Sequence, residues 1–408
     1  MFYLFFALFY STLVFYGYSA IRVLAHSKWL VISFWAVALG LFVLGFVLRA
    51  LNVSLGTRTE LYLTGLLFAV TFGLMVLSFF LILEDVVRLI SWTKSKLKSF
   101  FGAPQSTRID RRRFISATAV TVGALPFSSL IIGMGARNKY TLHTYDLVFD
   151  RLPKSFDGYT IVQISDLHLG SFASLEEFQP GLDTINDQAA DLLLFTGDMV
   201  NNQSAEALPY IEALATLGAK DGKFAVLGNH DYGSYNRDFD EDMAHEDVRN
   251  LLSIQQKMGF KTLNNESVKI YRGEDFFNLV GVENWGTGRF LKAGDLKQAT
   301  EDVDERVFTL LMSHDPSHWE AEVLGHDKKI DLCLSGHTHG FQFGVEIAGY
   351  KWSPIQYRYP QWAGMYEKNN LLLNVNRGFG FLGYPGRFGI WPEITRIRLK
   401  SSEYGSVE

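Results

Sequence analysis

Residues 224–231 read Phe-Ala-Val-Leu-Gly-Asn-His-Asp, a short apolar run that ends in a cluster of polar side chains. The same arrangement recurs along the second half of the chain, in runs at residues 159–165, 192–196, 224–227, 307–313 and 332–335. Such runs are typical of strands buried on both faces of a sheet. Helix-compatible stretches at 174–189 and 206–217 separate some of them, which predicts an α/β domain from about residue 140 onward, with its site at the carboxyl ends of strands.

The polar clusters after these runs contain the candidate site residues. They are Asp166-Leu-His168, Gly197-Asp198, Gly228-Asn229-His230-Asp231, Ser313-His314-Asp315 and Gly336-His337-Thr338-His339-Gly340. Each cluster alone is compatible with a helix cap or a satisfied polar side chain. Burying five such polar clusters at strand ends costs free energy unless their polar groups have partners, and a metal centre would provide them. Donors of this kind, without sulfur, suit Mn, Fe or Zn. Two such ions can clamp a phosphoryl group for in-line displacement.

The series DxH, GD, GNHD, H and GHTH, in this order, resembles the calcineurin-like metallophosphoesterase superfamily. The quoted segments Ile164–Gly170, Thr196–Asp198, Val226–Asp231 and Leu334–Gly340 are most similar to its membrane-tethered bacterial branch. The resemblance covers residues 140–400. It implies a four-layer α/β/β/α sandwich with two divalent metal ions at the strand ends, with manganese expected and iron or zinc as alternatives.

The resemblance also implies which residues hold the metals. The first ion would be held by Asp166, His168 and His339. The second would be held by Asn229, His314 and His337, and Asp198 would bridge the two.

One further site residue follows from the resemblance, and two positions depart from the family pattern. His230 falls where the family has the residue that binds phosphate and protonates the leaving oxygen. Phe341 stands where relatives often have a second glycine. Asn201 stands where many members have an aspartate that orients the catalytic histidine. An amide stabilises an imidazolium less than a carboxylate does, so His230 is the site assignment with the least support.

The first third of the chain is predicted to be a membrane anchor. Uncharged stretches at residues 1–21, 29–48, 61–83 and 114–136 are long enough to cross a bilayer, which takes about 20 residues of helix. The fourth contains Pro126 and many small residues, so a surface-lying helix or a removable export segment is its alternative. We therefore expect an N-terminal α-helical transmembrane bundle at 1–136, a linker and first strand region at 137–158, and the α/β metallophosphoesterase domain at 159–400.

The charge distribution predicts the orientation of this anchor. Residues 1–136 carry a net charge of +8, whereas the rest of the chain carries −13. Ten Lys/Arg residues lie in segments 22–28 and 84–113, on one side of the predicted spans, against Arg49 and Arg58 on the other. The positive-inside rule makes the first side cytoplasmic. The catalytic domain is thus expected outside the cytoplasm, on an integral protein of the cell (inner) membrane.

Segment 94–113 is dense in Lys and Arg and is expected to contact anionic headgroups. Within it, residues 110–115 (DRRRFI) also resemble a twin-arginine export signal, which would put the domain on the same side. The acidic second half disfavours nucleic acid as a partner. The single cysteine, Cys333, excludes an intramolecular disulfide and a thiolate zinc site.

The predicted function is metal-dependent hydrolysis of a phosphoester or pyrophosphate, in an amphiphilic or lipid-linked phosphate, with membrane lipids as further partners. Aromatic residues between Trp352 and Trp391 either flank the site at the membrane interface or simply pack strands and loops. The first alternative is hydrolysis of a water-soluble phosphodiester or monoester, with the anchor serving only for localisation. A non-catalytic interaction module is disfavoured because every ligand position is filled. A deaminase-type site is disfavoured by Asn229, and a transport function by the uncharged spans. The oligomeric state is left open.

Overall fold

The structure, a computed structural model, describes residues 2–25, 27–50, 57–99 and 109–402. Residues 51–56 of the predicted loop 49–60 and residues 100–108 of the basic segment 94–113 lie outside these described residues. The chain divides into two compact units, Met1–Gly135 and Ala136–Glu408.

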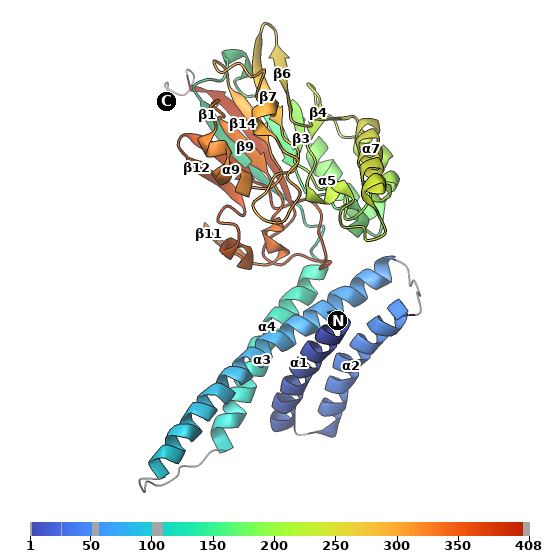
Figure 1. Ribbon diagram of the computed structural model, residues 1–408, viewed down its shortest axis with the longest axis vertical. Helices are drawn as coiled ribbons and strands as arrows, with labels where there is room; N and C mark the ends of the chain where they lie inside the picture. The colour runs from blue at the N-terminus through green and yellow to red at the C-terminus, as the bar shows by residue number, and fades with distance from the viewer. Residues whose placement is uncertain (1, 26, 51–56, 100–108, 403–408) are drawn as a thin grey trace. The chain divides into compact units, whose positions relative to one another are not determined.

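The described part of the first unit consists of four helices (Figure 1). They are α1 (Phe2–Leu24), α2 (Lys28–Ala50), α3 (Thr57–Ser99) and α4 (Ile109–Met134). Each contains a stretch long and apolar enough to cross a membrane. Helix α4 continues through Pro126. Helices α3 and α4 approach closely at Gly73 and Gly123, where a Cβ on either glycine would lie about 3 Å from the backbone oxygen of the other.

The predicted loop from residue 84 is wrong, because α3 continues past Leu83 to Ser99. The charged side chains that suggested a loop are compatible with helix. Arg88 pairs with Asp85 at 2.5 Å and with Glu84 at 3.4 Å, three and four residues earlier on the same helix. Such spacings favour helix over loop.

The second unit contains two mixed six-stranded sheets (Figure 1). The first has the order β1-β14-β2-β3-β4-β5 and the second β12-β13-β9-β8-β7-β6. The strands of the first are β1 (Thr141–Phe149), β14 (Glu393–Ser401), β2 (Thr160–Ile164), β3 (Leu192–Phe195), β4 (Lys223–Ala225) and β5 (Phe260–Thr262). Those of the second are β12 (Gly364–Lys368), β13 (Leu371–Val375), β9 (Leu332–Ser335), β8 (Thr309–Met312), β7 (Asp275–Gly281) and β6 (Glu266–Arg272). All five apolar runs form strands, as predicted.

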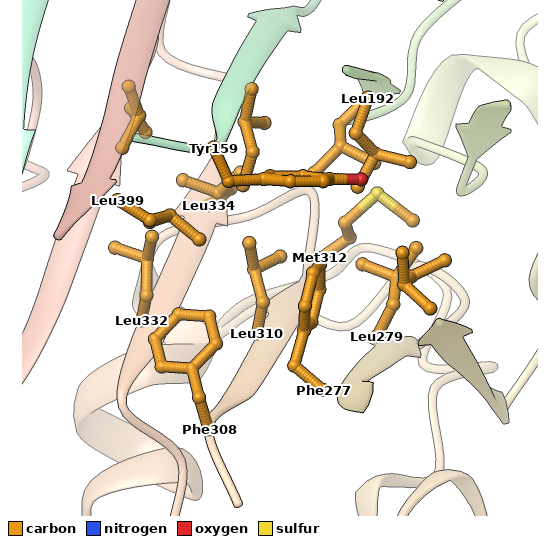
Figure 2. Close-up of a cluster of buried hydrophobic side chains, with 14 of the residues drawn as sticks. Tyr159, Leu192, Phe277, Leu279, Phe308, Leu310, Met312, Leu332, Leu334 and Leu399 are labelled. Carbon is orange, nitrogen blue, oxygen red and sulfur yellow. The ribbon is translucent and has the colours of Figure 1, made fainter. Parts of the chain in front are cut away.

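The two sheets enclose the main hydrophobic core. Alternate residues of each strand point into it, among them Leu192, Leu310 and Leu332, and Figure 2 shows them meeting around Tyr159 and Met312. On its other face, the second sheet packs Leu311 and Cys333 against Trp319 of α9 (Ser317–Ala321).

Helices complete the outer layers. Helix α7 (Glu241–Lys257) contacts β5, α5 (Leu175–Asn186) contacts β14, and α8 (Leu296–Ala299) contacts β6. The predicted helix at 206–217 is a 3₁₀ segment, Ser204–Tyr210, followed by the short α6 (Ile211–Ala215), because Pro209 interrupts regular helical hydrogen bonding. The result is the expected α/β/β/α sandwich. Strands β2, β3 and β4 are parallel, as are β8 and β9, so within each sheet the polar residues that follow them gather at one edge.

Candidate metal centre

The backbone at the candidate site adopts a conformation that side-chain-bearing residues rarely take. Asp166, His168, Asp198, His337 and His339 all have positive φ, between 46° and 71°. Each such residue costs on the order of 1–3 kcal/mol and persists only where the surrounding structure imposes it. Their concentration after β2, β3 and β9 indicates a functional constraint on these turns.

Close backbone approach explains two glycines of the polar clusters. A Cβ on Gly228 would collide with the Asp198 carboxylate, and one on Gly336 would collide with Ser165 and Asp166. These glycines let the turns after β4 and β9 come within contact distance of the carboxylates after β3 and β2.

The first group of potential ligands comprises Asp166, His168 and His339, all buried. The Nε2 atoms of His168 and His339 face each other at 3.0 Å, and Asp166 Oδ1 lies 3.3 Å from His339 Nε2. The other imidazole nitrogen of His168, Nδ1, is 3.0 Å from Oδ1 of Asn201. An Nδ1–H donated to that oxygen leaves the Nε2 lone pair directed at the centre of the group.

The second group comprises Asp198, His314 and His337. Asp198 Oδ2 lies 3.1 Å from His314 Nε2, and His314 Nδ1 is 2.7 Å from the carbonyl oxygen of Thr196. His337 Nδ1 lies 3.3 Å from His314 Nε2, while its Nε2 is 2.8 Å from the Tyr359 hydroxyl. The outward-facing nitrogens of His314 and His337 therefore have partners, and the nitrogens turned toward the centre are the potential metal donors.

Asp198 connects the two groups. The same Oδ2 atom that is 3.1 Å from His314 lies 3.6 Å from Nε2 of His168, which belongs to the first group. The second oxygen, Oδ1, accepts the backbone N–H of His230 at 2.8 Å. A carboxylate in this position can be shared by two cations.

Asn229 lies beside the second group, since its neighbours Gly228 and His230 both approach Asp198. Its Nδ2 donates to the Tyr235 hydroxyl at 2.9 Å, whereas its buried Oδ1 has no hydrogen-bond partner among the described residues. A buried carbonyl oxygen without a donor is costly in protein alone, and a hard cation would satisfy it. The donor set of carboxylate, imidazole and amide oxygens therefore fits a metal pair.

Burial keeps three of the four histidines in the neutral form that binds metal. It lowers the pKa of His168 to about 3, and it also lowers the pKa of His337 and His339. Burial would also lower the pKa of His314, but the adjacent Asp198 carboxylate outweighs it and raises the pKa to about 10. A cation beside Asp198 would displace that proton, so metal binding is expected to release it.

His230 is partly exposed, whereas His168, His314 and His339 are buried. Its Nδ1 lies 2.7 Å from the backbone carbonyl oxygen of Asn201, and its ring stacks on Tyr235 with centroids 4.1 Å apart. The ring of His168 contacts it edge to face, with centroids 4.9 Å apart. The imidazole is thus fixed beside the first group, with Nε2 as its remaining nitrogen.

The sequence-based view of Asn201 needs correction. The family resemblance predicts that the Asn201 side chain orients His230, but its amide oxygen faces His168 and only its backbone carbonyl contacts His230. Because any residue carries a backbone carbonyl, the replacement of aspartate by asparagine does not remove this orienting contact.

Two residues at the site, Tyr235 and Arg387, were missed from the sequence, and Tyr359 was included only as one of the aromatic residues between Trp352 and Trp391. Tyr359 joins His337 to Asp315, with its hydroxyl 3.4 Å from Asp315 Oδ2. Tyr235 contacts both His230 and Asn229. Arg387 is fully buried, with Nη2 3.3 Å from His339 Nδ1 and donating to the carbonyl oxygens of residues 378 and 380. Each lies outside the polar clusters, so no local signal marks it.

The aromatic stretch between Trp352 and Trp391 is mainly packing. Tyr359, Trp362, Phe381 and Tyr384 are buried, and only Tyr357 is largely exposed, at 80%. The expectation of an aromatic row at an interface therefore does not hold for most of this stretch.

The domain begins with residues that pack directly behind the site. Arg137 is buried, forms an ion pair with Glu177 at 2.7 Å, and lies over the ring of Phe381. The Tyr140 ring packs on Phe379, with centroids 4.3 Å apart. The backbone N–H groups of Phe379 and Gly380 donate to the carbonyl oxygens of residues 165 and 166. The chain thus enters the domain against the loop that supports Asp166.

Comparison with known proteins agrees with this geometry. The family model described as calcineurin-like phosphoesterase matches residues 159–341. The model described as probable calcineurin-like phosphoesterase, transmembrane domain, matches residues 1–136. The metallophosphoesterase YkuE of Bacillus subtilis is 31% identical over 310 residues, which are 72% of this chain and 99% of that protein. The chain belongs to the calcineurin-like phosphoesterase family. The sequence-based prediction of the family is confirmed.

Two further relatives match parts of this calcineurin-like phosphoesterase. A transmembrane protein with metallophosphoesterase domain from Danio rerio is 26% identical, over 63% of this chain and 56% of that protein. The UDP-2,3-diacylglucosamine pyrophosphatase LpxG of Chlamydia muridarum is 29% identical, over 61% of this chain and 86% of that protein. The chain is thus a membrane protein and a phosphoesterase of a family that uses two metal ions, which excludes the deaminase alternative.

Proposed function

We propose that this phosphoesterase hydrolyses a phosphoester or pyrophosphate bond in an amphiphilic or lipid-linked phosphate, with the reaction on the extracytoplasmic side of the membrane. The observation that supports the reaction best is the position of Asp198 Oδ2, within 3.6 Å of His168 and 3.1 Å of His314, between two complete sets of donors. A carboxylate placed between two donor sets can bridge two metal ions.

In this proposal, the first ion is held by Asp166, His168 and His339. The second is held by Asn229, His314 and His337, with Asp198 shared by both. When bound, two divalent ions supply Lewis-acid charge that activates water and stabilises the phosphoryl oxygens. Manganese is the proposed metal, with iron and zinc as alternatives, because the donors are nitrogen and oxygen without sulfur.

The charges at the site favour a phosphate group. The candidate ligands include two carboxylates, from Asp166 and Asp198, which offset only half of the charge of two divalent cations. Arg387 adds a buried guanidinium behind His339. The resulting excess of positive charge attracts a phosphate anion in a partly desolvated site.

His230 is proposed to protonate the leaving oxygen. An Nδ1–H donated to the carbonyl of Asn201 leaves Nε2 free to hold the transferable proton, and stacking on Tyr235 restricts the ring. Imidazole is the side-chain group that most often acts as a general acid in catalysis. Its partial exposure lets a substrate oxygen reach it.

Three observations favour an amphiphilic substrate. A four-helix membrane domain is far larger than tethering requires. The first residues of the catalytic domain, Arg137 and Tyr140, pack on the loop beside Asp166, so the connection from the membrane enters the domain near the site. In addition, the relative LpxG is named for a pyrophosphatase acting on a diacylated sugar nucleotide. A water-soluble phosphodiester or monoester is the second candidate.

The two candidates separate in one assay. Full-length protein in lipid nanodiscs, supplied with Mn²⁺, would be offered lipid-linked substrates and headgroup-only analogues with the same scissile bond, for a pyrophosphate and for a diester. We expect faster turnover of the lipid-linked form, and loss of turnover in Asp198→Asn but not in the exposed control Asp302→Asn. Equal turnover of both forms would contradict the lipid-linked substrate. Full activity of Asp198→Asn would contradict the metal-dependent reaction.

A further inference from the structure

A small hairpin outside the two main sheets carries its residues in an unusual arrangement. Strands β10 (Val345–Ile347) and β11 (Tyr350–Trp352) pair antiparallel, with Val345 opposite Trp352 and Ile347 opposite Tyr350. Directly opposed residues share a face of a hairpin. One face therefore consists of Val345, Ile347, Tyr350 and Trp352. The connecting residues 348 and 349 both have positive φ, at 51° and 83°, as in the tight turns that hold hairpins in register.

The charged residues of the hairpin point toward the domain. The remaining cross-strand pair, Glu346 and Lys351, occupies the opposite face. Glu346 accepts two hydrogen bonds from the buried Arg377, at 2.7 and 3.1 Å. Lys351 donates to the Tyr366 hydroxyl at 3.1 Å and to the carbonyl of residue 363. These contacts tie the charged face to the domain, although the Glu346 side chain remains 32% exposed.

The apolar face is left exposed. Ile347 is 69% exposed, Tyr350 65% and Val345 39%. This is the reverse of an ordinary surface hairpin, in which the apolar face packs on the core and the polar face meets water. Exposed apolar strand residues are a liability in water unless something covers them.

Two large exposed side chains lie on the segments that flank the hairpin. Phe341, 49% exposed, belongs to the 3₁₀ segment His339–Gln342, and Tyr357, 80% exposed, belongs to the 3₁₀ segment Pro354–Tyr357. These two segments contact each other. Phe341 also has a positive φ of 60°, which is strained for a bulky residue, two positions after His339. We call Phe341, Val345, Ile347, Tyr350 and Tyr357 the apolar patch.

The base of the hairpin is linked to the point where the chain enters the domain. Phe343 and Phe388 form a β-bridge, and the neighbouring Arg387 donates to the carbonyls of residues 378 and 380. The next residues of that loop, Phe379 and Phe381, pack on Tyr140 and Arg137. Only Gly135 and Ala136 separate Arg137 from Met134, the last residue of the membrane helix α4. The apolar patch and the membrane connection are thus joined through one loop.

We propose that the apolar patch docks on the lipid bilayer itself, with the hairpin inserted at the boundary between headgroups and acyl chains. Tyrosine and phenylalanine with aliphatic neighbours suit this boundary, where such elements lie about 5–10 Å deep. Because only Gly135 and Ala136 separate the domain from the membrane helix α4, a bilayer is always within its reach. The patch thereby holds the metal centre at headgroup level. This inference goes beyond the proposed function, because it concerns the surface and holds whichever phosphoester is cleaved.

A fluorescent probe on the hairpin tests the proposal without any assay of activity. Full-length Ile347→Cys would be labelled with an environment-sensitive fluorophore and placed in nanodiscs of phosphatidylethanolamine and phosphatidylglycerol, with or without spin-labelled quencher lipid. The native Cys333 is fully buried and burial raises its pKa to about 12, so it does not compete for label. The matched control is Tyr271→Cys on β6, which is 58% exposed.

We expect blue-shifted emission at position 347, quenched by the spin-labelled lipid, and water-like, unquenched emission at position 271. Adding Tyr350→Asp to Ile347→Cys should abolish the quenching by lipid. Equal, water-like emission at both positions would overturn the proposal. Quenching at position 347 that requires a second labelled protein copy, and not the spin-labelled lipid, would overturn it as well. Docking on lipid together with equal turnover of lipid-linked and headgroup-only substrates would leave this inference standing and overturn only the proposed substrate.

Discussion

Oδ1 of Asn201 lies 3.0 Å from Nδ1 of His168, while the backbone oxygen of the same asparagine lies 2.7 Å from Nδ1 of His230. One residue therefore orients a candidate metal ligand with its side chain and the candidate acid with its main chain. The two functions can be separated by mutation, because only the first depends on the side chain.

Asn201→Ala is expected to weaken metal binding at the first group by about 10- to 100-fold, the usual cost of losing a partner that orients a histidine ligand. The substitution should hardly change how turnover depends on the leaving group, because the backbone carbonyl of residue 201 would still orient His230. Metal affinity measured by calorimetry checks this, with the exposed neighbour Asn202→Ala as control. Unchanged affinity in Asn201→Ala would show that His168 is not a ligand oriented in this way.

His230→Ala should keep its metal content and lose turnover, by about 10²- to 10⁴-fold for substrates with poor leaving groups. Aryl phosphates, whose leaving oxygens need little protonation, should lose much less. Parallel kinetics on alkyl and aryl esters measure the difference, with the exposed His245→Ala on α7 as control. An equal loss on both kinds of ester would rule out the acid role.

Arg377→Met is expected to lower the free energy of unfolding by about 3–5 kcal/mol, because it leaves a buried carboxylate without its partner. Arg377 pairs with the fully buried Glu393 at 2.5 Å. The matched control is Lys400→Met, which removes an exposed pair with Asp146 and should cost at most about 1 kcal/mol. Chemical unfolding of both variants gives the comparison, and similar losses would contradict it.

The same pair predicts a pH dependence. Burial alone raises the pKa of Glu393, but the Arg377 guanidinium outweighs it and lowers the pKa below its usual value. The stabilisation is therefore complete above the unfolded pKa of about 4.3, and is lost as pH falls through the folded value. The stability difference between the native protein and Glu393→Gln should shrink below about pH 4, as measured by unfolding at several pH values. A constant difference would exclude ionised Glu393 as its source.

The distribution of Lys and Arg predicts that the catalytic domain lies outside the cytoplasm. In spheroplasts, a membrane-impermeant maleimide should label Tyr271→Cys, whereas the buried native Cys333 should stay unlabelled. Labelling only in inverted vesicles would reverse the orientation.

Local patterns were sufficient to predict the polar clusters and the five strands that precede them. Val226–Asp231 and Leu334–Gly340 each combine a buried strand end with its turn, so the residues and their conformational demands are adjacent in sequence. The full length of α3 was not predicted. The charged side chains near its end form ion pairs within the helix, such as Asp85 with Arg88, and composition alone does not reveal these pairs.

Contacts between distant segments could not be read from the sequence. Arg387 reaches His339 across 48 residues, and Tyr359 reaches His337 across 22, each from segments without a polar cluster of their own. The sequence of the hairpin also did not indicate which of its two faces is exposed. Alternation of Val345, Glu346 and Ile347 predicts two faces, but only the ion pair of Glu346 with Arg377 reveals which face points outward.

The most direct test of the central claim, a metal pair sharing Asp198, is electron paramagnetic resonance of the manganese-loaded full-length protein together with its metal content and turnover. We expect two manganese ions per chain with an exchange-coupled signal, and in Asp198→Asn a loss of coupling and of hydrolysis together. Full hydrolysis by metal-free protein, or by Asp198→Asn without a coupled pair, would contradict the account.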